Sequence, residues 1–124
     1  FKQANIGVVK KGLVGVIKEG TGARAFAGAG YEAAGKTGTA QVFSLKGEAY
    51  HAGKVKERLR DHALFMAYAP ADKPKIALAV VVENGGFGAQ SAAPIARMVF
   101  DYYLLGKVPA GAAIEDAAAV EADE

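Results

Sequence analysis

The chain has 124 residues, of which 52% are hydrophobic and 23% are charged, a balance typical of a small globular domain or a piece of a larger one. Its net charge of +2 is too small to favour nucleic acid or an anionic membrane as a partner, and no basic stripe interleaved with aromatic residues indicates nucleic-acid binding. The absence of cysteine excludes disulfide bonds, thiolate catalysis and cysteine-based zinc sites.

The first predicted element is an amphipathic helix over Ile6–Glu19. Its apolar residues recur at the three- and four-residue spacing of a helix, and lysines occupy the other side. The apolar positions are Val9, Leu13, Val16 and Ile17. Gly20 is expected to end the helix, and the small residues of Gly20–Gly30 predict a loop after it.

Three strands are predicted next. Ala33–Phe43 becomes β-branched and aromatic after a polar start, which favours an extended strand. The polar residues of Ser44–Asp61 predict a long connection. His62–Ala69 is apolar on both alternating faces, as in a central strand covered on both sides. A short Pro70–Pro74 turn makes Lys75–Glu83 its antiparallel partner in a hairpin.

The strand Lys75–Glu83 alternates between a bulky face and a small one. The bulky face carries Ile76, Leu78, Val80 and Val82, and the small face carries Ala77, Ala79 and Val81. The small face leaves room for a helix to lie close.

A second helix is predicted to be capped by the hydroxyl of Ser91, with Pro94 in its first turn and Gly106 at its end. Its apolar stripe is expected to comprise Ile95, Val99, Tyr102 and Tyr103. Val108–Glu124 is mostly alanine and acidic residues and is predicted to be a disordered acidic tail, which leaves residues 1–107 as the folded part.

Together these elements predict an α+β fold in which three antiparallel strands are flanked by N- and C-terminal helices. Helices can cover one face of such a sheet. We expect the other face to need a cover that this chain does not obviously supply.

Gly30–Thr37 matches the phosphate-loop pattern G-x-x-x-x-G-K-[ST], in which backbone N–H groups at the start of a helix cradle phosphates. The preceding Ala23–Ala29 is not strand-like, and the residues after Thr37 make a poor first helical turn. Nucleotide binding at this loop is kept as an alternative to the interpretation that follows.

The same residues contain Lys36, Thr37, Gly38 and Thr39 at the head of a strand. In serine acyltransferases that react with penicillin, a K-T-G triad lies on a strand beside the nucleophile. Lys36 would supply positive charge for proton transfer and for a substrate carboxylate, to which the hydroxyls of Thr37 and Thr39 would donate hydrogen bonds. Gly38 removes a side chain where a substrate approaches the strand edge. The backbone N–H of Thr39 can join the nucleophile's own N–H as an oxyanion hole.

The sequence resembles the C-terminal part of the transpeptidase domain of class B penicillin-binding proteins, and within that class it is most similar to the elongation-specific branch. The resemblance runs from about residue 8 to residue 106 and implies part of the fold that these proteins share with serine β-lactamases. It is carried by Gly35–Phe43, Glu57–His62, Phe65–Pro70 and Glu83–Gly86.

The resemblance also implies an activity and its partners. In the family, a serine attacks the D-Ala-D-Ala end of a peptidoglycan stem peptide, forms an acyl-enzyme and passes the acyl group to an amine on a neighbouring strand, and β-lactams acylate the same serine. The family further implies an inner-membrane anchor, a periplasmic catalytic domain and a membrane glycan polymerase of the SEDS family as partner. It implies neither a cofactor nor a metal.

The chain departs from the family in lacking the S-x-x-K and S-x-N elements, which in the family precede Lys-Thr-Gly. Its only serines are Ser44 and Ser91, and neither has a lysine three residues later. We therefore expect this chain, which begins with Phe1, to be the C-terminal portion of a longer enzyme and to be inactive alone. The alternatives are a segment of a serine β-lactamase or β-lactam sensor, which share the strand motif, and a non-enzymatic interaction module.

Two further groups are assigned structural roles. For His62 a hydrogen-bonding role is favoured over catalysis, because the adjacent Asp61 would point to the opposite face of a strand. Arg58, Arg60 and Asp61 are expected to form an ion-pair cluster that orders the loop, with a substrate contact as the alternative.

Overall fold

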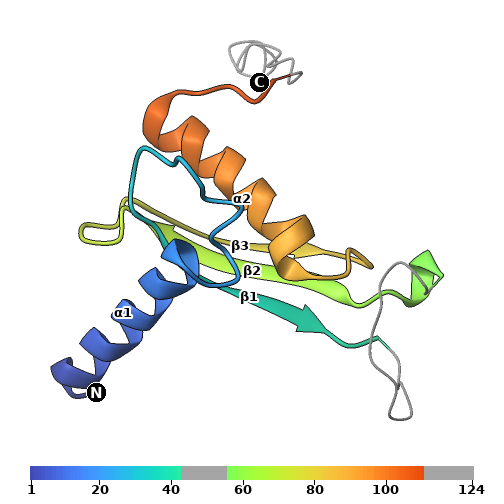
Figure 1. Ribbon diagram of the computed structural model, residues 1–124, viewed down its shortest axis with the longest axis horizontal. Helices are drawn as coiled ribbons and strands as arrows, with labels where there is room; N and C mark the ends of the chain where they lie inside the picture. Colours follow the sequence, from blue (N-terminus) through green and yellow to red (C-terminus); the bar gives the residue numbers. More distant parts are fainter. Residues whose placement is uncertain (43–55, 111–124) are drawn as a thin grey trace, which may run out of the picture.

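The computed structural model describes residues 1–42 and 56–110, and it arranges them as helices around a three-stranded antiparallel sheet (Figure 1). α2 lies across one face of the sheet, and α1 packs against β1. The predicted α+β fold with helices at both ends is confirmed. In chain order the elements are α1 (Gln3–Lys18), β1 (Ala34–Ala40), the 3₁₀ turn η2 (Glu57–Leu59), β2 (His62–Ala69), β3 (Ile76–Val82) and α2 (Gly88–Leu105).

The sheet has the strand order β1-β2-β3, and both neighbouring pairs are antiparallel. β2 has its predicted bounds, and β3 lies one residue inside the predicted range at each end. β1 ends at Ala40, earlier than expected. Phe43, residues 44–55 of the predicted connection and residues 111–124 of the predicted acidic tail lie outside the described residues.

α2 packs on the bulky face of β3, so the expectation that a helix would use the small face is wrong. The bulky face is part of the core, whereas Ala77, Ala79 and Val81 are exposed. The reason is that the helix supplies the small residues of this contact. The buried side of α2 includes Ala92, Ala93 and Ala96, and large strand side chains fill the space that these alanines leave.

The predicted apolar stripe of α2 is wrong for the same reason. Its four residues are exposed, Tyr103 by 59%, whereas the buried side combines the alanines with Phe100. The exposed stripe comprises Ile95, Val99, Tyr102 and Tyr103. Alanine is apolar but carries little bulk, so the large apolar residues at helical spacing mark the outer face of this helix.

The start of α2 also differs from the prediction. The helix begins at Gly88, so Ser91 does not cap it and Pro94 lies in the second turn. The hydroxyl of Ser91 instead donates a hydrogen bond to the carbonyl oxygen of Gly85, 2.6 Å away. The end is as predicted, because Gly106 takes the left-handed conformation, with φ 67°, that closes a helix.

The core lies between the sheet and α2. Phe65 of β2 and Phe100 of α2 are its largest fully buried side chains. Phe26, from the segment between α1 and β1, places its ring 5.8 Å from the ring of Phe65 and 6.2 Å from that of Phe100. This segment is therefore fixed to the core although it has no regular structure.

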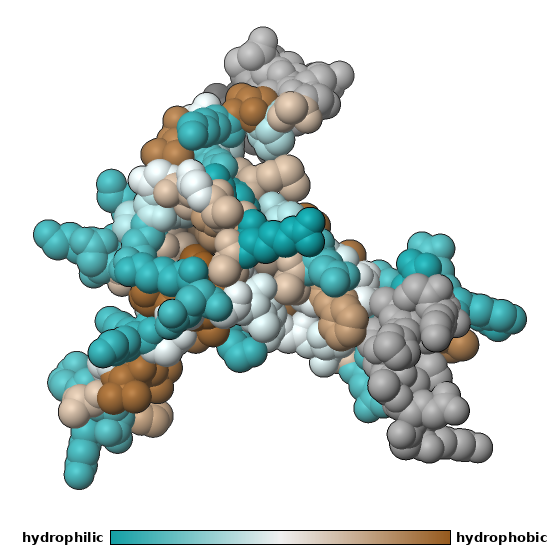
Figure 2. Space-filling model, in the orientation of Figure 1, coloured by the Kyte–Doolittle hydropathy of each residue, from teal (hydrophilic) through white to brown (hydrophobic). Residues whose placement is uncertain are grey.

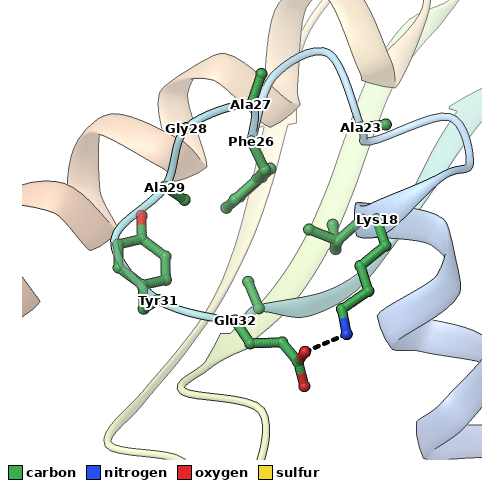
Figure 3. Close-up of a pocket in the computed structure, with 10 residues that line it drawn as sticks. Lys18, Ala23, Phe26, Ala27, Gly28, Ala29, Tyr31 and Glu32 are labelled. Atoms are coloured by element: carbon green, nitrogen blue, oxygen red, sulfur yellow. Dashed lines mark ion pairs between the residues drawn. The ribbon is translucent and has the colours of Figure 1, made fainter.

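The segment between α1 and β1 also borders a pocket of about 370 Å³, shown in Figure 3. Phe26 and Tyr31 belong to this segment, and Lys18 at the end of α1 forms an ion pair with Glu32 just before β1. Because both charged side chains are well exposed, the pair adds little stability. It does show how closely the end of α1 approaches the start of β1.

Much of the sheet face opposite α2 is exposed in the described part of the chain, as expected. Met66 of β2 and Val81 of β3 are each 60% exposed there. α1 projects from the sheet, and Figure 2 shows apolar residues (brown) beside hydrophilic ones (teal) on its projecting end. Val8 and Val9 of that end are 72% and 61% exposed. Apolar surface of this extent is typical of a contact region with further protein.

Candidate functional site

The Lys-Thr-Gly-Thr run lies within β1, at an edge of the sheet. β1 spans Ala34–Ala40 and has only β2 beside it, so its other edge has no strand partner within the described sheet. The prediction that Lys36, Thr37, Gly38 and Thr39 start a strand is confirmed. The phosphate-loop alternative is wrong, because a strand replaces the loop-to-helix junction that phosphate binding requires.

The register of β1 assigns the four residues to two faces. Lys36 is paired with Met66 and Gly38 with Leu64, so both belong to the open face of the sheet. Thr37 and Thr39 alternate to the other face, the side on which α2 packs. The cation and the bare glycine therefore share one side of the strand, and the two hydroxyls share the other.

The side chain of Lys36 contacts the backbone of β1. Its Nζ donates a hydrogen bond to the carbonyl oxygen of Thr37 over 2.8 Å. A carbonyl oxygen that accepts from a side chain in this way indicates a group at the free edge, away from β2. In an antiparallel pair the N–H and C=O of one residue point to the same side, and alternate residues repeat the direction. The N–H of Thr39 is thus directed to the same free edge as the carbonyl of Thr37.

Glycines let α2 and β2 approach this strand closely. A Cβ atom on Gly88, the first residue of α2, would lie 2.1 Å from the carbonyl oxygen of Leu64 and 2.5 Å from that of Gly38. A Cβ atom on Gly38 would lie 3.1 Å from the Cβ of Leu64 on the open face. The start of α2 therefore rests directly on the backbone of the Lys-Thr-Gly-Thr run.

Asp61 holds the chain just after β1. Asp61 is buried, with only 5% of its surface exposed. Its carboxylate accepts a hydrogen bond from the N–H of Val42, at 3.0 Å. The side-chain amide of Asn84 donates to the carbonyl oxygens of Arg58 and Arg60, and the N–H of Asn84 donates to Nδ1 of His62. The hydrogen-bonding role predicted for His62 is confirmed. Contacts to the backbone therefore help to order this region, and the ion-pair cluster of Arg58, Arg60 and Asp61 stays a prediction.

A partly buried charged group that sequence reasoning missed joins α2 to the segment before β1. Arg97 pairs with Asp101, and the hydroxyl of Tyr31 donates to the same carboxylate at 2.7 Å. Arg97 also donates to the carbonyl oxygens of Ala25 and Ala27. Asp101 follows Arg97 by four residues, which is the only signal in the sequence, because the contacts to Tyr31 and the loop span about 70 positions.

The titration of this group follows from its contacts. Burial alone would raise the pKa of Asp101, but the hydrogen bonds from Arg97 and Tyr31 and the charge of Arg97 outweigh it and hold that pKa below its usual range. Burial, together with the hydrogen bond to Asp101 and its charge, raises the pKa of Tyr31. Tyr31 is therefore a neutral donor to an ionised carboxylate at neutral pH.

Replacing Asp101 by asparagine is expected to lower the free energy of unfolding by about 2 kcal/mol at neutral pH, because the hydrogen bonds lose their charged acceptor. A carboxyl whose folded-state pKa is depressed contributes stability that is present above its unfolded pKa and lost as the pH falls through the folded pKa. The loss caused by D101N should therefore shrink as the pH is lowered toward about 3. Urea unfolding of the full chain, at neutral pH and at about pH 3, measures the loss in free energy of unfolding.

The exposed Asp72, in the turn between β2 and β3, offers a matched control for this measurement. D72N should leave the urea concentration at the midpoint of unfolding unchanged at both pH values. A loss for D101N that stayed constant with pH would show that the charge of Asp101 is not what stabilises the contact.

A further hydroxyl, that of Thr21, lies beside the site, and sequence reasoning missed it as well. Oγ1 of Thr21, just after α1, is 2.8 Å from Oγ1 of Thr37. The two residues are sixteen positions apart, and no motif marks the first of them.

Two negative findings apply to the described residues alone. Across 1–42 and 56–110, no group of three or more His, Cys, Asp or Glu side chains is placed to hold a metal ion. Within the same ranges, neither helix combines the length and apolar character needed to cross a membrane.

Comparison with known proteins shows which family the chain resembles. A family model described as the penicillin binding protein transpeptidase domain matches residues 1–101. The peptidoglycan D,D-transpeptidase MrdA of Haemophilus influenzae is 52% identical over 103 residues, which cover 81% of this chain and 16% of that protein. The chain thus spans about a sixth of the length of this curated relative.

Solved structures agree with the sequence comparison. The crystal structure of PBP2 from Pseudomonas aeruginosa in complex with WCK 5153 matches with a TM-score of 0.69 and 41% identity, over 88% of this chain and 22% of that one. A penicillin G acyl-enzyme complex of penicillin-binding protein A from Mycobacterium tuberculosis matches with a TM-score of 0.54 and 33% identity, over 79% of this chain and 20% of that one. The resemblance to class B penicillin-binding proteins is confirmed, including the similarity to penicillin-binding protein 2.

Proposed function

Because the chain belongs to the penicillin-binding protein transpeptidase family, we propose that it is the C-terminal portion of a peptidoglycan D,D-transpeptidase. Residues 1–107 would form the end of the catalytic domain, and residues 108–124 a tail beyond it. The observation that carries the proposal is the free edge of β1, where Lys36 and the N–H of Thr39 lie together. The nucleophilic serine would come from the sequence before Phe1.

Each residue of the run has a role in this reaction. The serine oxygen attacks the carbonyl carbon of the D-Ala-D-Ala bond, the terminal D-alanine leaves, and an amine then takes the acyl group from the serine. Thr37 and Thr39 donate hydrogen bonds to the terminal carboxylate. The N–H of Thr39 stabilises the oxyanion, a donor type worth about 2.7–4 kcal/mol of barrier. Gly38 leaves room for the substrate beside the strand.

Lys36 supplies the positive charge of the site. Its ammonium has three donors, of which one is used by the carbonyl of Thr37, so two are left for the reacting groups. A β-lactam follows the same path: the serine attacks the ring carbonyl, the ring C–N bond breaks, and the acyl group stays on the serine. The penicillin G acyl-enzyme of the mycobacterial neighbour supports this step.

We extend the proposal to the setting of the longer enzyme. Its substrates are peptidoglycan stem peptides, so its catalytic domain would face the periplasm from an inner-membrane anchor. A membrane glycan polymerase of the SEDS family would supply the strands to be cross-linked. The name of the Haemophilus influenzae relative, a peptidoglycan D,D-transpeptidase, supports peptidoglycan as the substrate class.

The isolated chain is expected to form no covalent adduct with penicillin G. Neither of its serines has the lysine of the S-x-x-K element, and the hydroxyl of Ser91 is occupied by the carbonyl of Gly85. Intact-mass spectrometry after incubation measures this directly. The extended protein, meaning this chain together with the sequence that precedes Phe1, should gain the mass of one penicillin. An adduct on the isolated chain would place a nucleophile here and contradict the proposed division of the site.

A further inference from the structure

The hydroxyl pair of Thr21 and Thr37 gives the site a residue beyond the Lys-Thr-Gly-Thr run. We propose that Thr21 is a positioning residue for carboxylate recognition: its hydroxyl orients and polarises that of Thr37, so that the pair delivers one hydrogen bond to the terminal carboxylate of the ligand. The 2.8 Å distance between the two Oγ1 atoms carries the inference. It rests on the proposed function, because it needs a ligand that bears a carboxylate at β1.

The turn that presents Thr21 is closely packed. The N–H of Gly22 donates to the carbonyl oxygen of Val16 over 2.9 Å, which ties the turn back to α1. A Cβ atom on Gly22 would lie 2.9 Å from Cδ1 of Ile17, a buried core residue. Thr21 therefore extends from a turn anchored to the core, and its hydroxyl is held at β1 before any ligand arrives.

Counting protons shows what the pair can do. Each hydroxyl has one proton to donate and two lone pairs to accept. The hydrogen bond between the two hydroxyls uses one of these protons, so the other remains free to be donated. Beside an anion the favourable arrangement has Thr21 donating to Thr37, which leaves the Thr37 proton for the carboxylate. A hydroxyl that accepts one hydrogen bond is polarised and donates the next more strongly.

The surroundings of Thr37 suit an anion. Thr21 is exposed and Thr37 is half-buried, so the pair can be reached from solvent. The ammonium of Lys36 lies on the carbonyl of Thr37 and brings positive charge to the same residue. A carboxylate at this edge of β1 would meet the ammonium, and the hydroxyl of Thr37 is already held in place by its contact with Thr21. Pre-orientation lowers the ordering cost of binding and so increases affinity.

The test compares T21V with T21S in the extended protein, using penicillin G and its methyl ester, which lacks the free carboxylate. Valine has nearly the shape of threonine without the hydroxyl. T21V should weaken the binding of penicillin G before acylation about tenfold, with the limiting acylation rate unchanged. The methyl ester should change by less than about twofold, and T21S should restore binding of penicillin G. R24A, at an exposed residue of the same turn, should match the unaltered protein.

Two results would overturn the inference alone. Unchanged binding of penicillin G by T21V would show that the hydroxyl does not contribute. An equal loss for penicillin G and its methyl ester would show that Thr21 supports the fold and does not serve the carboxylate. Failure of the unaltered extended protein to react with penicillin G would instead overturn the proposed function, and the inference with it.

Discussion

Replacing Lys36 by alanine in the extended protein is expected to slow acylation by penicillin G by a factor of about 100 or more, the lower end of what a positioned proton-transfer group contributes. The side chain bends from the open face of β1 to the carbonyl of Thr37, so its charge lies at the edge where the substrate binds. Its loss removes both the attraction for the carboxylate and a participant in proton transfer. Time-resolved intact-mass spectrometry gives the acylation rate.

The control for this prediction is Lys75, an exposed lysine just before β3. K75A removes the same charge from the protein at a position outside the proposed site, and it should react like the unaltered protein. Equal melting temperatures for K36A and K75A would show that the fold is intact in both. Unchanged acylation of K36A would remove Lys36 from its assigned role.

Replacing Gly88 by alanine is expected to lower the free energy of unfolding by about 3 kcal/mol, at the upper end of typical overpacking costs. The added methyl group would lie 2.1 Å from the carbonyl oxygen of Leu64 and 2.5 Å from that of Gly38. Both atoms belong to the backbone of paired strands, so neither can move aside cheaply. The start of α2 must lift from the sheet, and urea unfolding of the full chain measures the cost.

Gly12, in the middle of α1, provides the matched control for G88A. No atom lies within 4 Å of a Cβ built on Gly12, so G12A meets no clash and should stabilise the chain by up to about 1 kcal/mol through helix propensity. If G88A were as stable as the unaltered chain, the close approach of α2 to β1 would not be a feature of the folded protein. Because Gly38 is one of the clashing residues, G88A should also slow acylation of the extended protein.

The strands were predictable because their patterns are local. The uninterrupted apolar run of β2 and the alternation of β3 set their bounds to within one residue, and a short turn between them required a hairpin. The packing of α2 was not predictable in the same way. Its buried side is built on Ala92, Ala93 and Ala96, and only the shape of the facing sheet shows that small residues are needed there.

The same distinction between local and long-range signals applies to the residues of the site. The Lys-Thr-Gly-Thr run could be found because its four residues are contiguous and their chemistry is distinctive. Thr21 could not, because its role depends on a turn that brings it back to Thr37. The group formed by Arg97, Asp101 and Tyr31 joins segments far apart in the chain, and its long-range contact leaves no periodic signal.

The strand order has a consequence for how the site assembles as the chain folds. β2 and β3 are joined by a short turn, so they can pair early, whereas β1 reaches β2 only across the long connection that follows Ala40. We therefore expect β1 to join the hairpin last. β3 also has one neighbour in the described sheet, but a short turn ties it to β2, so β1 is expected to detach first in a local opening. The Lys-Thr-Gly-Thr run would then lose and regain its strand conformation, while the hairpin beneath α2 keeps its structure.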